Sequence, residues 1–338
     1  MQIKLFQRLT LFATALALCV VVLGAYTRLS NAGLGCPDWP GCYNQLTVPQ
    51  VEQNLEQAQQ DFPQRSFESG KAWKEMVHRY FAGTLGLIIF FIAVLAWQRR
   101  HESGQAVKLP LFLVLLVIFQ ALLGMWTVTL LLKPVVVMGH LLGGLATMTL
   151  LWWLTLRSNH YFKSAQDNAV KSLRPWVITG LIILVCQIAL GGWTSANYAA
   201  LACPDFPTCQ TRWWPPMDFR EAFILWRGLG IDYEGGVLGN DARVAIHVAH
   251  RIGAVVTLLY LGSLALYTVL ARGMESMRRA GFVVLLVLIT QISLGIANVV
   301  LSLPLPVAVA HNSVAALLLL SLVAMLHKLV PNPDTVKA

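Results

Sequence analysis

The chain has 338 residues, of which 57% are hydrophobic and only 12% are charged, and its formal net charge is +9. Together with a mean hydropathy of +0.63, this composition excludes an ordinary water-soluble domain and favours a protein that crosses a lipid bilayer. A nucleic-acid-binding protein would need a soluble basic surface, which so apolar a sequence does not supply, so nucleic acid is not an expected partner.

Eight apolar runs are each long enough to cross about 30 Å of hydrocarbon as a helix. The run at 9–27 could instead be a cleaved signal peptide, but it is long for one and is similar to a run at 175–196 that cannot be cleaved. We therefore predict an all-α integral membrane protein in contact with lipid, with spans at approximately 9–27, 76–97, 110–132, 134–156, 175–196, 244–270, 281–302 and 306–327.

Lysine and arginine are concentrated in the segments that a cytoplasmic N-terminus would place inside the cell. This is the asymmetry that the positive-inside rule describes. We therefore predict a multi-pass protein with both termini in the cytoplasm and with long outer loops at about 28–75 and 197–243.

Both outer loops contain a Cys-Pro-Asp-aromatic-Pro-x-Cys motif. The prolines stiffen each loop and the outer face of a membrane is oxidising, so we predict the disulfides Cys36–Cys42 and Cys203–Cys209. A structural zinc site is the alternative, although it would need ligands closer in sequence and usually more of them. Residues 47–62 predict a polar helix outside the membrane, and 211–240 an interfacial lid; both could also be spacers.

The two halves of the sequence resemble each other. LGAYTRLSNAGLGCPDWPGC at 23–42 recurs as LGGWTSANYAALACPDFPTC at 190–209, and later stretches match at similar offsets. Such self-similarity indicates a duplication. We predict two tandem-duplicated four-helix bundles related by a pseudo-twofold axis along the membrane normal, with boundaries at 1–157, 158–174 (a cytoplasmic linker) and 175–338.

Four histidines lie at matching places near the outer ends of predicted spans, His78 and His140 in the first half and His250 and His311 in the second. A single histidine of this kind would ordinarily be interpreted as a core residue that is satisfied by a hydrogen bond. Four histidines at matching positions favour a functional role, because ionisable residues are costly in a membrane. A pair without nearby carboxylate or thiolate partners suits a low-spin haem with one imidazole on each face of the iron, whereas zinc usually needs a third protein ligand.

Arg79 and Arg251 directly follow the first histidine of each half. A guanidinium group at the outer edge of a haem site could pair with a propionate. The alternative is that both side chains simply extend towards the membrane surface.

The halves differ in one chemical respect. Glu75 stands three residues before His78, whereas His247 stands three residues before His250. A carboxylate can stabilise developing positive charge or accept a proton, and a histidine does not supply a fixed negative charge. The alternative is that Glu75 only charges the first turn of its helix. We therefore predict chemistry in the first half and a permanent cofactor in the second.

These motifs together resemble haem A synthases over essentially the whole chain. The residues that carry the resemblance are the stretch 24–40, Glu75-Met-Val-His78-Arg79, His140, His250-Arg251 and His311. The family consists of inner-membrane enzymes that oxidise the C8 methyl of haem O to the formyl group of haem A for cytochrome oxidase. The resemblance implies a resident haem b on His250 and His311, substrate haem O between His78 and His140 near the outer (periplasmic) face, and Glu75 as the catalytic residue.

By this resemblance, two hydroxylations of the methyl give a carbinol and then a geminal diol, which loses water to leave the aldehyde. Glu75 is expected to stabilise cationic character at that carbon and to help deprotonate the attacking water. The resident haem would pass electrons to a quinone or another acceptor. A haem O synthase would supply the substrate, and cytochrome oxidase assembly would use the product.

The main alternative is a di-haem b-type membrane electron carrier to or from quinone, with bis-histidine ligation at both sites. Haems that relay electrons across a bilayer sit at different depths, whereas the four histidines are predicted to share one level. A haem exporter or chaperone is a third hypothesis.

Overall fold

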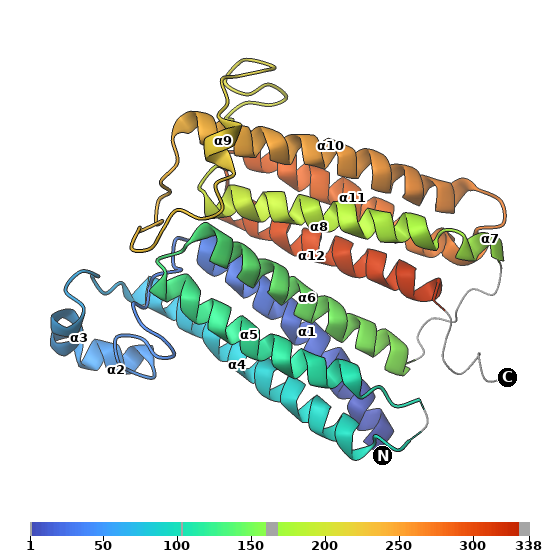
Figure 1. The fold of residues 1–338 in the computed structure, drawn as a ribbon, viewed down its shortest axis with the longest axis horizontal. Coiled ribbons are helices and arrows are strands. Elements are labelled where there is room, and N and C mark those ends of the chain that lie inside the picture. Colours follow the sequence, from blue (N-terminus) through green and yellow to red (C-terminus); the bar gives the residue numbers. More distant parts are fainter. Residues whose placement is uncertain (1, 103, 160–167, 331–338) are drawn as a thin grey trace.

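The computed structural model describes residues 2–102, 104–159 and 168–330, and this part of the chain is helical, without β-strands (Figure 1). Eight of its helices are long and apolar enough to cross a membrane. They are α1 (Gln2–Leu29), α4 (Ser69–Gln98), α5 (Lys108–Thr129), α6 (Pro134–Asn159), α8 (Arg174–Ala196), α10 (Asn240–Leu270), α11 (Glu275–Val300) and α12 (Leu305–Lys328). The predicted all-α membrane class and its eight spans are confirmed.

Four helices begin at least four residues earlier than the hydropathy pattern predicted. They are α1 (Gln2 rather than 9), α4 (Ser69 rather than 76), α10 (Asn240 rather than 244) and α11 (Glu275 rather than 281). The charged residues in these first turns lower the hydropathy without interrupting the backbone hydrogen bonds, so the helices extend beyond the apolar part of each span.

Four short helices complete the described chain: α2 (Val48–Gln53), α3 (Leu55–Asp61), α7 (Asn168–Lys171) and α9 (Phe219–Ala222). The polar helix predicted at 47–62 is therefore confirmed as two short helices. α2 begins with a capping box in which Thr47 and Gln50 satisfy each other's backbone amides. Between residues 211 and 239 the described chain forms the helix α9, α10 begins at Asn240, and the lid role of 211–240 stays a prediction.

The spans form two groups of four, which lie side by side in Figure 1. In the first group α1 and α5 each pack against α4 and α6, so α4 and α6 face each other on a diagonal. In the second group α8 and α11 each pack against α10 and α12, which form the other diagonal. We call these groups the N-bundle and the C-bundle. Their origin by duplication and the pseudo-twofold axis stay predictions.

The two bundles contact each other through α1 and α6 on one side and α8 and α12 on the other. One cluster of buried apolar side chains runs through both, including Met148 and Leu318. Across the contact, the indole Nε1 of Trp152 donates to the carbonyl oxygen of Leu320 at 3.0 Å. In lipid such close packing and interhelical hydrogen bonds hold helices together, because hydrocarbon itself gives little drive for association.

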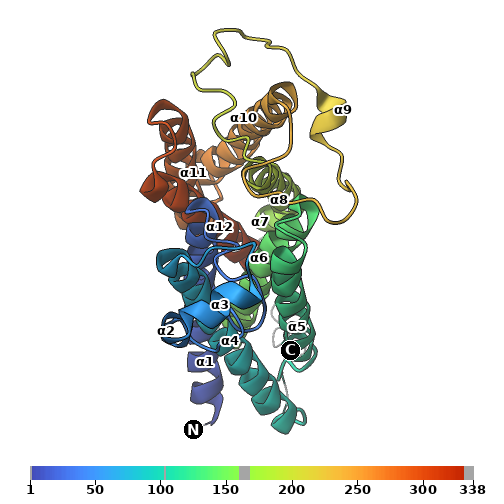
Figure 2. The same cartoon turned by 90° about the vertical axis from the view of Figure 1, so that its left-hand side faces the viewer.

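The long loops lie at one end of the bundles, and the beginning of α1 and the end of α12 lie at the other (Figures 1 and 2). At the loop end, Arg65 of the first loop forms ion pairs with Asp232 at 2.7 Å and Glu234 at 2.6 Å. The loops of the two halves are therefore tied to each other. Residues 160–167 of the predicted linker 158–174 and the tail 331–338 lie outside the described residues.

Candidate active site

His78 of α4 and His140 of α6 meet inside the N-bundle, because these two helices face each other on its diagonal. Their ring centres are 6.4 Å apart and the ring planes are nearly perpendicular, at 86°. Imidazole nitrogens bond a metal ion at about 2.0 Å, so two imidazoles on opposite sides of one ion have ring centres about 6 Å apart. The spacing of His78 and His140 therefore fits one metal ion between them.

Each of the four histidines packs against a glycine of a neighbouring helix. The pairs are His78 with Gly24, His140 with Gly124, His250 with Gly191, and His311 with Gly295. A β-carbon added to these glycines would lie 2.9, 3.4, 3.0 and 3.1 Å, respectively, from the imidazole Cε1. A larger residue would push the ring aside in at least three of the four places, so the glycines define where each imidazole lies.

Several polar atoms beside these rings are buried without a hydrogen-bond partner. They are Nδ1 of His78 and of His140, both amide atoms of Gln120, and Oε1 of Gln187 and of Gln291. Buried polar groups in proteins are normally paired. Unused hydrogen-bonding capacity in both bundles, together with the His78–His140 spacing, fits a site that receives a metal-bearing group.

The described residues contain no group of three or more His, Cys, Asp or Glu side chains that could hold a metal ion. The histidine sites are therefore two-ligand sites in the part of the chain that the structure covers. Two protein ligands suit a macrocycle that supplies the remaining four nitrogens, as haem does.

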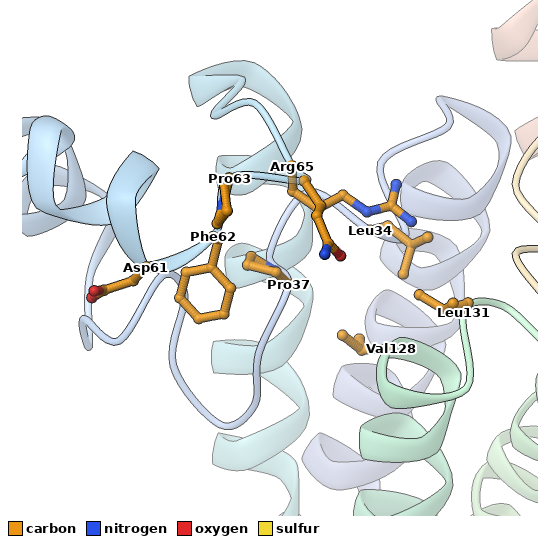
Figure 3. A pocket seen from close by; sticks show the side chains of 9 residues that line it. Leu34, Pro37, Asp61, Phe62, Pro63, Arg65, Val128 and Leu131 are labelled. Carbon is orange, nitrogen blue, oxygen red and sulfur yellow. The ribbon is translucent and has the colours of Figure 1, made fainter. Parts of the chain in front are cut away.

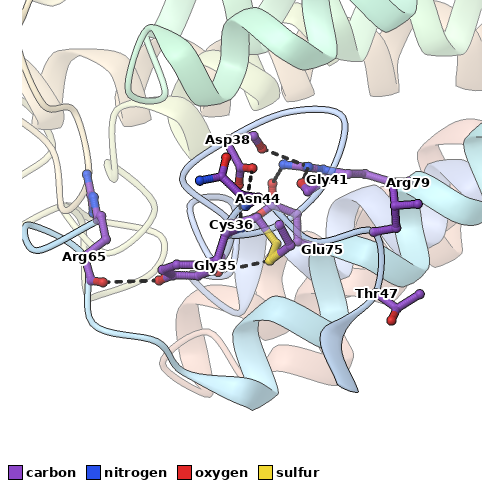
Figure 4. Close-up of a disulfide and its surroundings, with 12 residues drawn as sticks. Gly35, Cys36, Asp38, Gly41, Asn44, Thr47, Arg65, Glu75 and Arg79 are labelled. Atoms are coloured by element: carbon purple, nitrogen blue, oxygen red, sulfur yellow. Dashed lines mark hydrogen bonds and ion pairs between the residues drawn. A yellow bond between two sulfur atoms is a disulfide. The ribbon is translucent and has the colours of Figure 1, made fainter. Parts of the chain in front are cut away.

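Glu75 is buried and tied to the first disulfide loop (Figure 4). Its carboxylate forms an ion pair with Arg79 one turn further along α4, and it accepts a hydrogen bond from the backbone N–H of Cys36 at 2.9 Å. Because residues three apart share a helix face, Glu75 lies on the same side of α4 as His78. A paired, buried carboxylate therefore stands next to the histidine site.

Arg79 and Arg251, which directly follow His78 and His250, donate hydrogen bonds to the backbone of the two disulfide loops. Arg79 donates to the carbonyl oxygens of Asp38 at 3.0 Å and Pro40 at 3.3 Å, in addition to its ion pair. Arg251 donates to the carbonyl oxygens of Asp205 at 2.8 Å and Thr208 at 2.7 Å. A guanidinium group has five donors in a fixed plane, which suits several carbonyls at once. Contacts of these arginines with propionates stay a prediction.

Both disulfides are present, Cys36–Cys42 and Cys203–Cys209, which confirms the predicted pairing. In each loop the aspartate of the motif accepts two backbone amides. Asp38 accepts those of Tyr43 and Asn44, and Asp205 those of Gln210 and Thr211, at 2.6 to 3.0 Å. The cystine and the aspartate together make each loop compact.

His247 takes a different position from Glu75. Its Nδ1 lies 3.1 Å from the carbonyl oxygen of Ala199, and the side chain is buried. His247 therefore contacts the backbone of the segment that follows α8, whereas Glu75 contacts the backbone of the Cys36–Cys42 loop.

A pocket at the loop end lies between the first long loop and the end of α5 (Figure 3). Among the described residues its lining includes Leu34, Phe62, Arg65 and Leu131, and it carries no histidine. It therefore belongs to the packing of the long loops rather than to the histidine pairs.

Comparison with known proteins agrees with this arrangement. Residues 7–323 match the model of a family described as cytochrome oxidase assembly protein. The chain is 47% identical over 325 residues to a protein named haem A synthase from Shewanella oneidensis, with 96% of each chain covered. Similar matches of the same name come from Bacillus licheniformis, at 25% identity with 91% of this chain and 90% of the relative covered, and from Caulobacter vibrioides, at 26% with 90% of both covered.

Proposed function

The chain belongs to the cytochrome oxidase assembly protein family, and from this premise we propose that it is a haem A synthase, an oxidoreductase that converts haem O to haem A. The observation that carries the proposal is the 47% identity, over 96% of the chain, to a relative of that name. The distance of 6.4 Å between the ring centres of His78 and His140 supports the proposal independently, because a haem enzyme of this kind needs paired imidazoles.

The two bundles have separate tasks in this proposal. The N-bundle, within residues 1–157, binds haem O as substrate between His78 and His140. The C-bundle, within residues 175–338, binds a resident haem b between His250 and His311. The glycines that face all four imidazoles support equivalent ligand positions, and the carboxylate of Glu75 supports chemistry in the N-bundle only.

The reaction changes a methyl group into a formyl group. Each of two successive hydroxylations adds one oxygen from water to the C8 methyl and removes two protons and two electrons. The geminal diol then loses water to leave the aldehyde. The protein must therefore accept protons near the substrate and must let electrons leave.

Glu75 is the residue proposed to handle the protons. Its ion pair with Arg79 and the hydrogen bond from Cys36 favour the charged carboxylate in a buried place. A carboxylate there stabilises positive character at the reacting carbon and helps deprotonate the attacking water. The Cys36–Cys42 loop fixes its position.

The electrons are proposed to leave through the C-bundle, where haem b would supply one-electron redox chemistry. α6 carries His140 and α12 carries His311, and these two helices pack against each other between the bundles. Adjacent ligand helices support a short path between the two sites. A quinone or another acceptor in the inner membrane would complete the reaction.

The experiment is to express the chain with a source of haem O and to separate the extracted haems by chromatography. A synthase yields haem A, with haem b as the resident group. Haem b alone would contradict the proposal and would favour the di-haem electron carrier. Protein with all four histidines replaced by alanine gives the background.

A further inference from the structure

A five-residue pattern recurs on the four helices that face the histidines. It ends in Leu-Gly, and the glycine is the one that packs against the imidazole. In three helices the pattern begins with glutamine: Gln120 to Gly124 in α5, Gln187 to Gly191 in α8, and Gln291 to Gly295 in α11. α1 has Val20 at this position before Gly24. Residues four apart share a helix face, so the first residue of each pattern points towards the same histidine as the glycine.

In the C-bundle both histidines have an amide next to the ring. Nε2 of Gln187 lies 3.1 Å from Nδ1 of His250 and donates to the carbonyl oxygen of the same residue at 3.0 Å. Nε2 of Gln291 lies 3.3 Å from Nδ1 and 3.2 Å from Nε2 of His311. A carboxamide carries both donors and an acceptor, so it can pair with Nδ1 whichever tautomer the imidazole adopts.

In the N-bundle, the two histidines differ in whether a glutamine stands at the first position of the facing pattern. Gln120 is buried and packs against Gly143, one turn after His140; a β-carbon on Gly143 would lie only 1.9 Å from its Nε2. His78 faces Val20 instead, and its Nδ1 has no side-chain hydrogen-bond partner. The side chain of valine has no group that could provide one, which leaves the backbone of Val20 as the neighbouring polar group. Of the four imidazoles, His78 is thus the one whose pattern lacks the amide.

The residue one turn after the histidine also differs between the bundles. Gln187 packs against Gly253, one turn after His250, where a β-carbon would lie 2.1 Å from its Oε1. The residue one turn after His78 is Phe81. At corresponding positions, α8 and α10 therefore carry glutamine and glycine, whereas α1 and α4 carry valine and phenylalanine.

We propose that the amide beside each imidazole determines how firmly a bundle holds its haem, and that Val20 makes His78 a releasable ligand. Groups that bond the outer nitrogen of a metal-bound histidine fix the ring and strengthen the ligand, and their loss costs about 10–100-fold in metal affinity. A site that must exchange substrate for product needs a weaker ligand, whereas a resident haem needs two firm ones. This inference rests on the proposed assignment of substrate to the N-bundle and of haem b to the C-bundle.

The test measures haem loss rather than catalysis. Purified protein in detergent is loaded with haem b on a His78→Ala background, or with haem O on a His250→Ala background, so that each bundle is measured alone. Excess apomyoglobin then captures released haem, and the absorbance change gives the rate of loss. We expect faster loss from the N-bundle than from the C-bundle.

Two sets of variants separate hydrogen bonding from shape. Gln187→Val should speed loss from the C-bundle at least roughly tenfold, and Gln187→Met, which keeps the length of the side chain but has no amide, should do the same. Val20→Gln combined with Phe81→Gly rebuilds the C-bundle arrangement and should slow loss from the N-bundle. Phe81→Gly alone is its control.

Unchanged rates in the Gln187 variants would overturn the inference, as would a Gln187→Met variant that behaves like the parent. Slower loss from the N-bundle than from the C-bundle before any glutamine is changed would also overturn it. Failure of either background to bind haem at all would overturn the proposed function itself, and the inference with it. The two failures are therefore distinguishable.

Discussion

The backbone N–H of Cys36 donates directly to the carboxylate of Glu75, across 2.9 Å. This bond joins the disulfide loop of the N-bundle to the helix that carries His78. Arg79 adds a second link, since it forms an ion pair with Glu75 and donates to a carbonyl oxygen of the same loop. The loop, the carboxylate and the helix that carries His78 are therefore connected, and a substitution in one of them should shift the positions of the others.

Glu75→Gln keeps the size of the side chain and removes its charge. We expect both haems to bind and formyl production to fall about 10²–10⁴-fold, because the variant cannot accept a proton or stabilise positive charge. Chromatography of haems from membranes without another synthase measures the yield. Glu68→Gln, an exposed carboxylate paired with Lys71, is the matched control. A normal haem A yield from Glu75→Gln would refute the role.

Cys36→Ser opens the first disulfide loop. We expect haem content and thermal stability to fall more than the rate per bound haem, because the loop holds Glu75 and its arginine in place. Loss of a native disulfide typically costs about 2–5 kcal/mol in small domains. The haem-to-protein ratio and a thermal melt measure the effect. Cys19→Ser, at a free and exposed cysteine, controls for substitution alone. An unchanged haem content would count against this interpretation.

Gly191→Ala places a β-carbon 3.0 Å from Cε1 of His250. Overpacking of this kind costs about 1–3 kcal/mol, so haem b should bind roughly tenfold or more weakly. The absorbance of haem b per protein reports it. Gly83→Ala, where a β-carbon meets nothing within 4 Å, should bind haem b normally. Equal haem content in the two variants would show that the facing glycine does not position the ring.

The Cys203–Cys209 loop should stay folded to a lower pH than it would with an ordinary aspartate at position 205. The pKa of Asp205 is lowered, first by the hydrogen bond from the Thr208 hydroxyl and then by the backbone amides of Thr211 and Gln210. A lowered folded-state pKa gives stability above the unfolded value of about 3.9, and this stability is lost as pH falls through the folded value.

Thr208→Val should raise that pKa, so the loop should open at a higher pH than in the parent. Hydrogen exchange of residues 203–212, followed by mass spectrometry as pH is lowered, measures the midpoint. Thr211→Val keeps its backbone amide and is the control. A midpoint that does not move in Thr208→Val would show that the hydroxyl does not hold the aspartate.

Much of the architecture follows from the sequence, since long apolar runs have few alternatives in lipid and two cysteines six residues apart in a stiff loop have an obvious partner. The shared level of His78 and His140 along the N-bundle could also be predicted, because both lie near the beginnings of helices that start at the loop end. The glutamine side chains that contact the histidines could not be predicted. Gln187 is a single polar residue in an apolar run, and its histidine lies on another helix, so only packing reveals the pair.

The direction of the two arginine side chains could not be predicted from the sequence either. Arg79 and Arg251 lie near the loop ends of α4 and α10, but a sequence does not say which of several nearby acceptors a guanidinium reaches. The structure directs both to loop carbonyl oxygens. The repeated Leu-Gly pattern was the available signal for the histidine-facing glycines, since its spacing recurs on four helices.

Electron paramagnetic resonance of the oxidised, haem-loaded protein tests most directly whether each histidine pair holds one iron. Two low-spin ferric signals are expected, of the kind given by iron with an imidazole on each face. His140→Ala should abolish one signal and His311→Ala the other. Signals that survive both substitutions, or a high-spin signal from both sites in the unaltered protein, would contradict the account.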